Sequence, residues 1–283
     1  MPDKIRIIQA TDIIKAVAEL CIKANTCISS DIITALEKAK TVETLPLAVS
    51  TLDTLLKNAD IAQRENMPIC QDTGMAVVFV EIGCNAHVNG DISEAINVGV
   101  RQGYKKGYCR SSVVIDPVNR INTGDNTPAV IYYDFVKGDD LHITIAPKGF
   151  GSENKSGVCM LNPADGIDGV KDCILKIVSL AGASPCPPII VGVGIGGTMD
   201  KSALLSKQAL LRDVSSVNPN PYWAEVESEL LERINKLGIG PAGFGGKTTA
   251  LGVNILTYPT HIAGLPVAVN IGCHATRHMT AVI

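Results

Sequence analysis

Four residues near the end of the sequence could carry chemistry together: Cys273, His274, Arg277 and His278 fall within six positions. Cys273 comes just after an apolar run, residues 265–271, and directly after a glycine. A short run that is rich in Val and Ile and bounded by Gly and Pro is typical of a buried strand. A thiol directly after such a strand, beside a glycine and several polar groups, is placed for chemistry.

Nine cysteines are scattered over the chain, and no C-x-x-C pair occurs among them. A zinc-ribbon or thioredoxin-type motif therefore has no support. A chain of 283 residues does not need disulfides to fold, and a reducing compartment would not keep them, so we expect most of these cysteines to be small core hydrophobes. Three differ, because each lies in a rigid, non-helical segment next to a predicted buried strand: Cys70 in Pro-Ile-Cys-Gln-Asp-Thr-Gly, Cys186 in Ser-Pro-Cys-Pro-Pro and Cys273 in Ile-Gly-Cys-His.

Three thiolates without a fourth suit an iron–sulfur cluster in which one iron stays open to act as a Lewis acid. The three cysteines are far apart in the sequence, so any meeting depends on the fold. From spacing alone, a zinc site and three unrelated core thiols remain alternatives.

Composition excludes some classes of function. The net charge of −3 comes without a basic stripe, which argues against nucleic acid as the main partner. No long apolar run is free of Pro and Gly, so we expect no membrane span. The beginning of the sequence has no apolar signal segment, and we expect a soluble, cytoplasmic protein.

The periodicity predicts an α+β fold: an N-terminal helical section, then mixed sheets with flanking helices, in a single compact cluster-binding domain over residues 1–283. Residues 1–66 form the helical lobe, with Asp12 and Ser30 as candidate N-caps and Pro46 between two helices. Residues 128–135 and 141–146 predict a β-hairpin, and residues 113–115 a further strand.

Glycine-rich segments resemble nucleotide-binding motifs without completing them. Residues 192–197 fit G-x-G-x-x-G, but we expect no parallel strand to close a βαβ unit, so tight packing of a helix on a strand is the better explanation of these glycines. The segments around Lys155 and Lys247 nearly match a P-loop and could serve as anion cradles.

The quoted cysteine segments, with residues 148–156, 187–202, 240–253 and 258–278, resemble the iron–sulfur (class I) fumarases and the related L-tartrate dehydratases. The similarity is closest to the separate α subunit of two-subunit forms and extends from residue 68 to the end. The resemblance implies a 4Fe–4S cluster on Cys70, Cys186 and Cys273. Its implied substrate contacts are Gln71, Asp72, Arg110, His261 and a backbone group at Gly149 or Gly151.

The reaction that the resemblance implies is the reversible hydration of fumarate to (S)-malate. Asp72 would deliver a proton to the departing hydroxyl, Arg110 would bind a carboxylate, and His261 would donate or shuttle a proton. The resemblance assigns no role to Lys155, Lys247, His274, Arg277 or His278, which we expect at the surface or behind the site.

Longer family members continue into a second domain that this sequence lacks. We therefore expect a separate β subunit that carries the rest of the active site, in a heterotetramer or a larger assembly. L(+)-tartrate dehydratase is the nearest alternative function. A non-catalytic dicarboxylate- or nucleotide-binding module and a purely structural subunit are alternatives from other classes.

Overall fold

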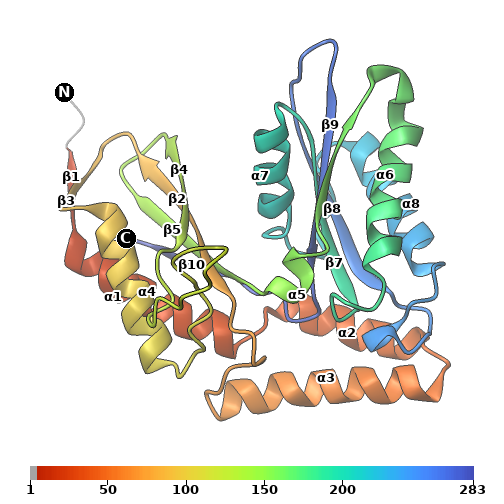
Figure 1. Cartoon of the computed structure of the whole chain (residues 1–283), viewed down its shortest axis with the longest axis horizontal. Coiled ribbons are helices and arrows are strands. Elements are labelled where there is room, and N and C mark those ends of the chain that lie inside the picture. Colours follow the sequence, from red (N-terminus) through yellow and green to blue (C-terminus); the bar gives the residue numbers. More distant parts are fainter. Residues whose placement is uncertain (1–4) are drawn as a thin grey trace. The chain divides into compact units, whose positions relative to one another are not determined.

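The computed structural model describes residues 5–283. Its helices and strands follow in a mixed order, which confirms the predicted α+β class. By its internal contacts the chain divides into two compact units (Figure 1). The first comprises Met1–Ile28, Asn58–Gly149 and Arg277–Ile283, and the second comprises Ser29–Lys57 and Phe150–Thr276. The sequence pattern did not predict this division into two units.

The first unit is built on a four-stranded sheet with the order β10-β5-β2-β4. One face of this sheet packs against helices α1 and α4, and Val78, Val80, Ile143 and Ile145 are buried in that core. A small parallel pair, β1 and β3, completes the unit. Its elements are β1 (Arg6–Gln9), α1 (Ala10–Thr26), β2 (Met75–Gly83), β3 (Ala86–Asn89), α4 (Ile92–Lys106), β4 (Val130–Val136), β5 (Leu141–Lys148) and β10 (Met279–Val282).

The predicted hairpin between residues 128–135 and 141–146 is wrong. Strands β4 and β5 form there, but β2 lies between them, parallel to β4 and antiparallel to β5. Residues 76–80 of β2 are all buried, and such a strand takes the interior of a sheet, where both of its edges are paired. The strand predicted at residues 113–115 is reduced to a single bridge between Val114 and Asn122.

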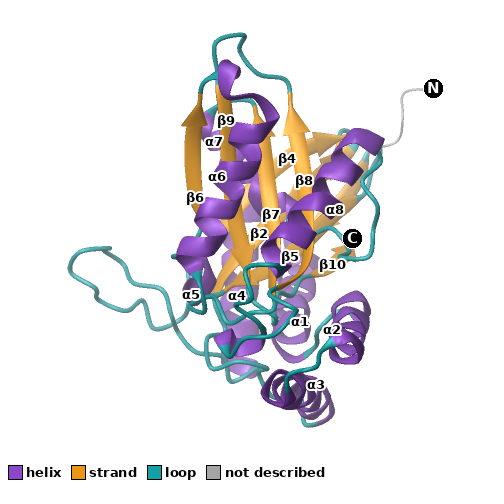
Figure 2. Cartoon of the chain, turned by 90° about the vertical axis from the view of Figure 1, so that its right-hand side faces the viewer, coloured by secondary structure: helices purple, strands orange, loops and turns teal. Residues whose placement is uncertain are grey.

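The second unit has a four-stranded sheet with the order β6-β9-β7-β8. Helix α7 covers one face, and α6 and α8 cover the other (Figure 2). Strands β7 and β8 are parallel, and β9 runs antiparallel to both of its neighbours. The elements are α2 (Ser30–Val42), α5 (Phe150–Glu153), β6 (Gly157–Leu161), a 3-10 turn (Pro163–Asp165), α6 (Gly166–Ala181), β7 (Ile189–Gly196), α7 (Met199–Ala209), α8 (Pro221–Asn235), a 3-10 turn (Pro241–Gly243), β8 (Ala250–Tyr258) and β9 (Leu265–Gly272).

The glycines of residues 192–197 hold α7 close to β7, as predicted. A Cβ at Gly192 would lie 2.2 Å from the Ser206 carbonyl oxygen, and one at Gly194 would lie 2.0 Å from that of Ser202. The expectation that no βαβ unit closes is wrong, because β7 and β8 are parallel neighbours joined through α7 and α8. No acidic residue follows directly on β8, where Pro-Thr-His stands, so a dinucleotide fingerprint is still incomplete.

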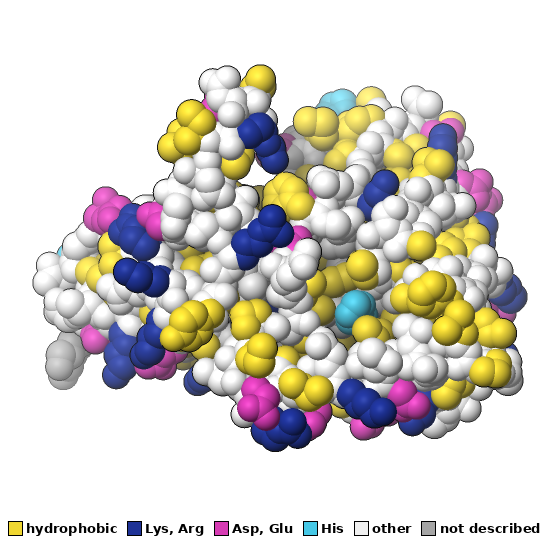
Figure 3. Space-filling view, turned by 60° about the horizontal axis from the view of Figure 1, so that its bottom comes forward, with side chains coloured by type: hydrophobic (Ala, Val, Ile, Leu, Met, Phe, Trp, Pro, Cys, Tyr) yellow, Lys and Arg dark blue, Asp and Glu magenta, His cyan; other side chains and the backbone are white. Residues whose placement is uncertain are grey.

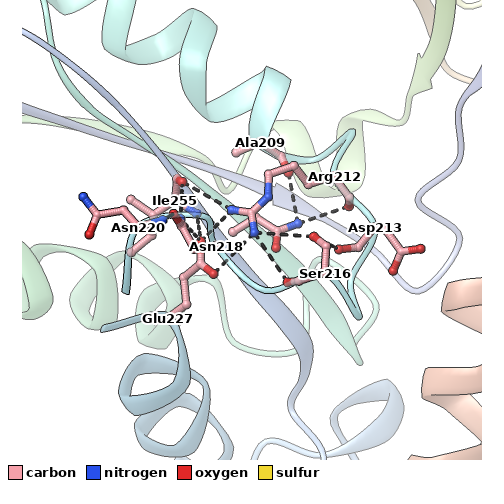
Figure 4. A network of polar contacts seen from close by, with 9 residues as sticks. Ala209, Arg212, Asp213, Ser216, Asn218, Asn220, Glu227 and Ile255 are labelled. Atoms are coloured by element: carbon pink, nitrogen blue, oxygen red, sulfur yellow. Dashed lines mark hydrogen bonds and ion pairs between the residues drawn. The ribbon is translucent and has the colours of Figure 1, made fainter. Parts of the chain in front are cut away.

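A buried polar network ties the connection between α7 and α8 to strand β8 (Figure 4). The Glu227 carboxylate accepts hydrogen bonds from Arg212 (2.6 Å), from the Asn218 amide (2.8 Å) and from the Ile255 backbone N–H (2.6 Å). Glu227 is buried, so a buried charge is stabilised by a cation and several donors at once. This network supports the sheet rather than any predicted site residue.

The helices of residues 1–66 form where expected, but they are divided between the units. Helix α1 belongs to the first unit and α2 to the second, while α3 (Pro46–Arg64) begins in the second and ends in the first. Pro46 opens α3, which confirms the predicted break. The two N-cap assignments are wrong: α1 begins at Ala10, two residues before Asp12, and Ser29 rather than Ser30 precedes α2.

On the face drawn in Figure 3, acidic and basic side chains of the described residues are interspersed. That face has no broad basic area of the kind that binds a phosphate backbone. None of the helices described in residues 5–283 combines the length and the apolar character needed to cross a membrane.

Candidate functional site

The loop that carries Cys70 is fixed at the preceding residue, Ile69, by two hydrogen bonds within the first unit. The Ile69 N–H donates to the carbonyl oxygen of Asn25 (2.9 Å), and the Ile69 carbonyl accepts from the Asn58 amide (2.9 Å). Cys70 itself is exposed and is a free thiol. The loop thus presents a sulfur atom from a backbone that is held by hydrogen bonds on its N-terminal side.

Asp72 is held from two directions. Its Oδ1 accepts the Gly74 N–H (3.0 Å), and its backbone carbonyl accepts a hydrogen bond from Arg277 (3.0 Å). Arg277 is only 4% exposed and also donates to the Asn25 side chain (3.1 Å). Arg277, for which the sequence suggested no role, therefore lies directly behind the Asp72 backbone.

Gly149 lies beside the Asp72 carboxylate, because a Cβ built on Gly149 would be 3.1 Å from Asp72 Oδ2. Any side chain at this position would press on that oxygen. The first unit therefore brings Gly149 to Asp72, and Gln71 is exposed next to it in the chain.

Arg110 is joined to the same loop through Thr73. The Thr73 hydroxyl accepts the Arg110 N–H (2.9 Å) and donates to the Arg110 carbonyl (3.3 Å). The Tyr104 hydroxyl reaches the carbonyl oxygens of Thr73 (3.1 Å) and Gly74 (3.2 Å) from the other side. Four predicted substrate-site residues, Gln71, Asp72, Arg110 and Gly149, thus lie on adjoining segments of one unit.

Cys186 and Cys273 lie on adjoining loops of the second unit. The carbonyl oxygen of Cys186 accepts the His274 N–H (3.4 Å) and lies 3.0 Å from His274 Nδ1. Cys186 has a φ of 56°, a left-handed conformation that costs energy in a residue with a Cβ and is frequent at functional sites. The hydrogen bond from Ala242 N–H to the Pro187 carbonyl (2.7 Å) holds the following residue in place.

Gly151, the alternative backbone contact, belongs to short helix α5 of the second unit. A Cβ on Gly151 would lie 3.9 Å from the Ser184 carbonyl, so Gly151 is next to the loop of Cys186. Glu153 anchors α5, because it pairs with Lys207 and accepts from the Asn270 amide (2.9 Å). Gly149 and Gly151 therefore adjoin different predicted groups, the first an acid and the second a cysteine loop.

His261 is not brought to the cysteines of its own unit. It is exposed in the turn between β8 and β9, where its Nδ1 accepts the Ala263 N–H (3.2 Å). Cys273 follows the opposite end of β9, and the eight residues of that strand span about 26 Å. Cys186 precedes the end of β7 that lies beside Gly272, so it shares the end of Cys273.

Neither predicted anion cradle is open. The backbone N–H groups of Lys247 and Thr248 both donate to Glu43 Oε1 (2.7 Å each), so a carboxylate of the chain itself fills that cradle. At Lys155 the N–H groups of the turn donate to carbonyl oxygens of the same turn. The Lys247 loop is therefore wrong as a site for an external anion, and at Lys155 the N–H groups of residues 154–156 are already used.

Four of the remaining cysteines differ from the three candidates in burial or bonding, whereas Cys27 and Cys84 are also accessible free thiols. Burial raises the pKa of Cys21 far above its ordinary value, and it raises the pKa of Cys109 to about 11. Cys159 and Cys173 form a disulfide, which contradicts the expectation that both are simple core thiols. Thiols that do not ionise readily, or that are already oxidised, are poor metal ligands.

The predicted ligands are divided between the units: Cys70 belongs to the first, and Cys186 and Cys273 belong to the second. Among the residues that the structure describes, no three His, Cys, Asp or Glu side chains are grouped as metal ligands. The donor set nevertheless suits iron, because all three are free, accessible thiols on non-helical segments.

Sequence reasoning missed four groups that hold these segments, Asn25, Thr73, Tyr104 and Asn126, and it named Arg277 without specifying its contacts. Each acts through backbone atoms of residues distant in the sequence. A hydroxyl, amide or guanidinium in such a role leaves no local spacing signal.

Residues 14–282 match the model of a protein family described as "Fumarate hydratase (Fumerase)". A Methanocaldococcus jannaschii protein named "Putative L(+)-tartrate dehydratase subunit alpha" is 41% identical over 92% of this chain and 94% of its own length. The "L(+)-tartrate dehydratase subunit alpha" of Escherichia coli strain K12 is 33% identical over 94% of this chain and 89% of its own length. The resemblance drawn from the cysteine segments is confirmed, and the chain belongs to the fumarate hydratase family of hydro-lyases.

Proposed function

We propose that this chain is the α subunit of an iron–sulfur hydro-lyase that hydrates fumarate reversibly to (S)-malate. The observation that carries the proposal is the family match over nearly the whole chain, together with the arrangement of the predicted site within each unit. Segments with Asp72 and Arg110 are joined in the first unit, and loops with Cys186 and Cys273 are joined in the second. The two units would then work as one cluster-binding domain over residues 1–283.

Cys70, Cys186 and Cys273 would hold a 4Fe–4S cluster. Such a cluster, when bound by three thiolates, supplies one open iron that acts as a Lewis acid toward the substrate hydroxyl. The three thiols are accessible and free, and the backbone beside each is fixed by hydrogen bonds.

Arg110 would bind a substrate carboxylate with its planar guanidinium, whose paired N–H groups match the two carboxylate oxygens. Asp72 would carry the proton that leaves with the hydroxyl during dehydration and returns during hydration. Its Oδ1 accepts the Gly74 N–H, and its Oδ2 lies on the side of Gly149. A side chain at Gly149 would press on that oxygen, and Gln71 and the backbone at Gly149 or Gly151 would add polar contacts.

The His261 side chain could meet a ligand at Cys186 and Cys273 only if these cysteines belong to a second copy of the chain. Strand β9 separates it from both cysteines within its own unit. We keep His261 as a proposed catalytic group on that condition, which agrees with the proposed heterotetramer or larger assembly.

The α-subunit names of the relatives support a separate β subunit as the partner. We propose that this partner completes the pocket and that the complex works in the cytoplasm. The purified chain should then show no fumarate hydration with a reconstituted cluster, and activity should appear on adding the β chain. Turnover by the chain alone would refute the division of the site.

L(+)-tartrate dehydratase is the second candidate, because two relatives that align over nearly their full length carry that name. Tartrate differs from malate by one more hydroxyl, so the same cluster chemistry would serve both substrates. Assays of the anaerobic complex with fumarate, (S)-malate and both enantiomers of tartrate decide between them. The preferred substrate is the one with the highest kcat/KM.

Serine substitutions test the cluster ligands independently of the substrate. Cys70→Ser, Cys186→Ser and Cys273→Ser should each abolish iron retention and visible absorbance after anaerobic reconstitution. Cys84→Ser is the matched control, because Cys84 is also an exposed free thiol of the first unit. Equal iron content in all four variants would show that the ligand assignment is wrong.

A further inference from the structure

Thr73 is almost fully buried, at 2% exposure, yet its hydroxyl serves a residue 37 positions away. It accepts the N–H of Arg110 at 2.9 Å and donates to the carbonyl of Arg110 at 3.3 Å. One side chain thus satisfies both backbone groups of a single residue, as a neighbouring strand would in a sheet. The backbone of Arg110 is thereby fixed in position and in orientation relative to Thr73.

A second side chain makes the next connection between the same two segments. Asn126, with no exposed surface, donates from Nδ2 to the Gly74 carbonyl (3.2 Å) and accepts the Ser112 N–H on Oδ1 (2.8 Å). Together the hydroxyl of Thr73 and the amide of Asn126 connect residues 73–74 to residues 110–112.

These side chains replace a β-ladder that the segment lacks. Helix α4 ends at Lys106, and between it and β4, which begins at Val130, the only β-pairing described is the isolated bridge between Val114 and Asn122. No strand of the described chain pairs with residues 110–112. The neighbours of Arg110 have other anchors, because the Cys109 N–H donates to the Tyr104 carbonyl (2.9 Å) and the Ser111 carbonyl accepts from the Asn122 amide (2.9 Å). At Arg110 itself, both backbone groups are bonded to Thr73.

We propose that Thr73 is a positioning residue that sets the place of Arg110 relative to Asp72 in the substrate pocket. Thr73 follows Asp72 directly in the chain, so its hydroxyl fixes the spacing between the group that would bind a carboxylate and the group that would carry the proton. This inference rests on the proposed function for the role of Arg110. Sub-ångström placement of such groups controls how well a site binds its ligand before any chemistry occurs.

The test compares Thr73→Val, which keeps the shape and removes the hydroxyl, with Thr73→Ser, which keeps the hydroxyl. Hydrogen–deuterium exchange on the isolated chain gives a readout that needs neither cluster nor substrate. The Val variant loses both hydrogen bonds of the hydroxyl, one of which protects the Arg110 N–H, so exchange at residues 110–112 should become about tenfold faster, while the Ser variant should stay close to the wild type. Equal protection in both variants would overturn the proposal. Should Thr73→Val fail to fold, Thr73→Ala provides the same comparison.

Kinetics of the reconstituted αβ complex then separate positioning from a general loss of structure. Thr73→Val should raise KM for the dicarboxylate about tenfold with an unchanged iron content and a much smaller change in kcat. In an Arg110→Ala background the Val substitution should add nothing to KM, because Thr73 acts through Arg110. Additive effects of the two substitutions would overturn the proposal.

A wild-type complex without dicarboxylate turnover would refute the proposed function instead. The exchange data would then still decide whether the Thr73 hydroxyl holds the Arg110 backbone.

Discussion

Arg277 offers the sharpest test of how the Cys70 loop is held, since it is a cation buried behind that loop. The guanidinium donates to the Asp72 carbonyl (3.0 Å) and to the Asn25 side chain (3.1 Å). Arg277→Met keeps an unbranched side chain of similar reach and removes both donors. Hydrogen bonds from a charged donor contribute at least about 1.5 kcal/mol each, so the free energy of unfolding should fall by about 3 kcal/mol. Arg277→Lys keeps the charge and can satisfy one acceptor, so we expect about half that loss.

Urea denaturation followed by far-ultraviolet circular dichroism measures these differences, and hydrogen exchange at residues 71–74 localises them. Arg64→Met is the matched control, because the Arg64 side chain is 62% exposed and its ion pairs with Asp60 and Glu65 lie at the surface. Such pairs contribute at most about 1 kcal/mol. If Arg277→Met unfolds within about 0.5 kcal/mol of the wild type, the buried guanidinium does not hold the loop and the reasoning fails.

Two further predictions concern packing and thiol reactivity. Gly194→Ala would place a Cβ 2.0 Å from the Ser202 carbonyl oxygen and should destabilise the fold by about 3 kcal/mol, since α7 would have to move. Gly264→Ala is the control, because the nearest atom to its Cβ would be 3.9 Å away, and it should leave the stability almost unchanged. Thermal denaturation of both variants measures the difference. Cys109, whose pKa is raised by burial to about 11, should react with iodoacetamide at pH 8 about 100-fold more slowly than an ordinary thiol, whereas exposed Cys84 should react readily. Because the folded-state pKa of Cys109 is the higher one, its contribution to stability is present below about pH 9 and is lost as the pH rises toward 11, and Cys109→Ala should remove that dependence.

Local patterns in the sequence predicted the separate elements well. The regular apolar spacing of residues 166–181, followed by Gly182, predicts a helix, and α6 spans these residues. The pairing of strands was predicted poorly, as β4 and β5 show. Two strands that are consecutive along the chain look like a hairpin, and nothing in their residues reveals that β2, about fifty positions earlier, lies between them.

For the candidate site, too, separate residues were easier to predict than the contacts between distant segments. Residues that would meet a substrate stood out because a thiol or a carboxylate in a rigid loop is unusual, and the first unit does bring Asp72 and Arg110 together. Arg277 stood out as part of a polar cluster, but its burial and its contacts were not predicted, because an arginine is usually at the surface. Its burial depends on Asn25 and on the Asp72 carbonyl, neither of which adjoins it in sequence.

In the segment Cys-Gln-Asp-Thr-Gly, residues 70–74, the first three residues and the last two differ in burial and in what they contact. Its first three residues are exposed or partly exposed, and these are the ones proposed to meet the cluster and the substrate. Its last two are buried and bind protein: the Thr73 hydroxyl holds Arg110, and Gly74 has a φ of 74° at a point where a Cβ would lie 2.8 Å from the Lys148 backbone. Thr73 and Gly74 are therefore constrained because the backbone of a neighbouring segment passes there, whereas Cys70 and Asp72 would be required by the proposed chemistry. A substitution in the second half of the motif should impair binding by moving Arg110 even though it removes no group that touches the substrate.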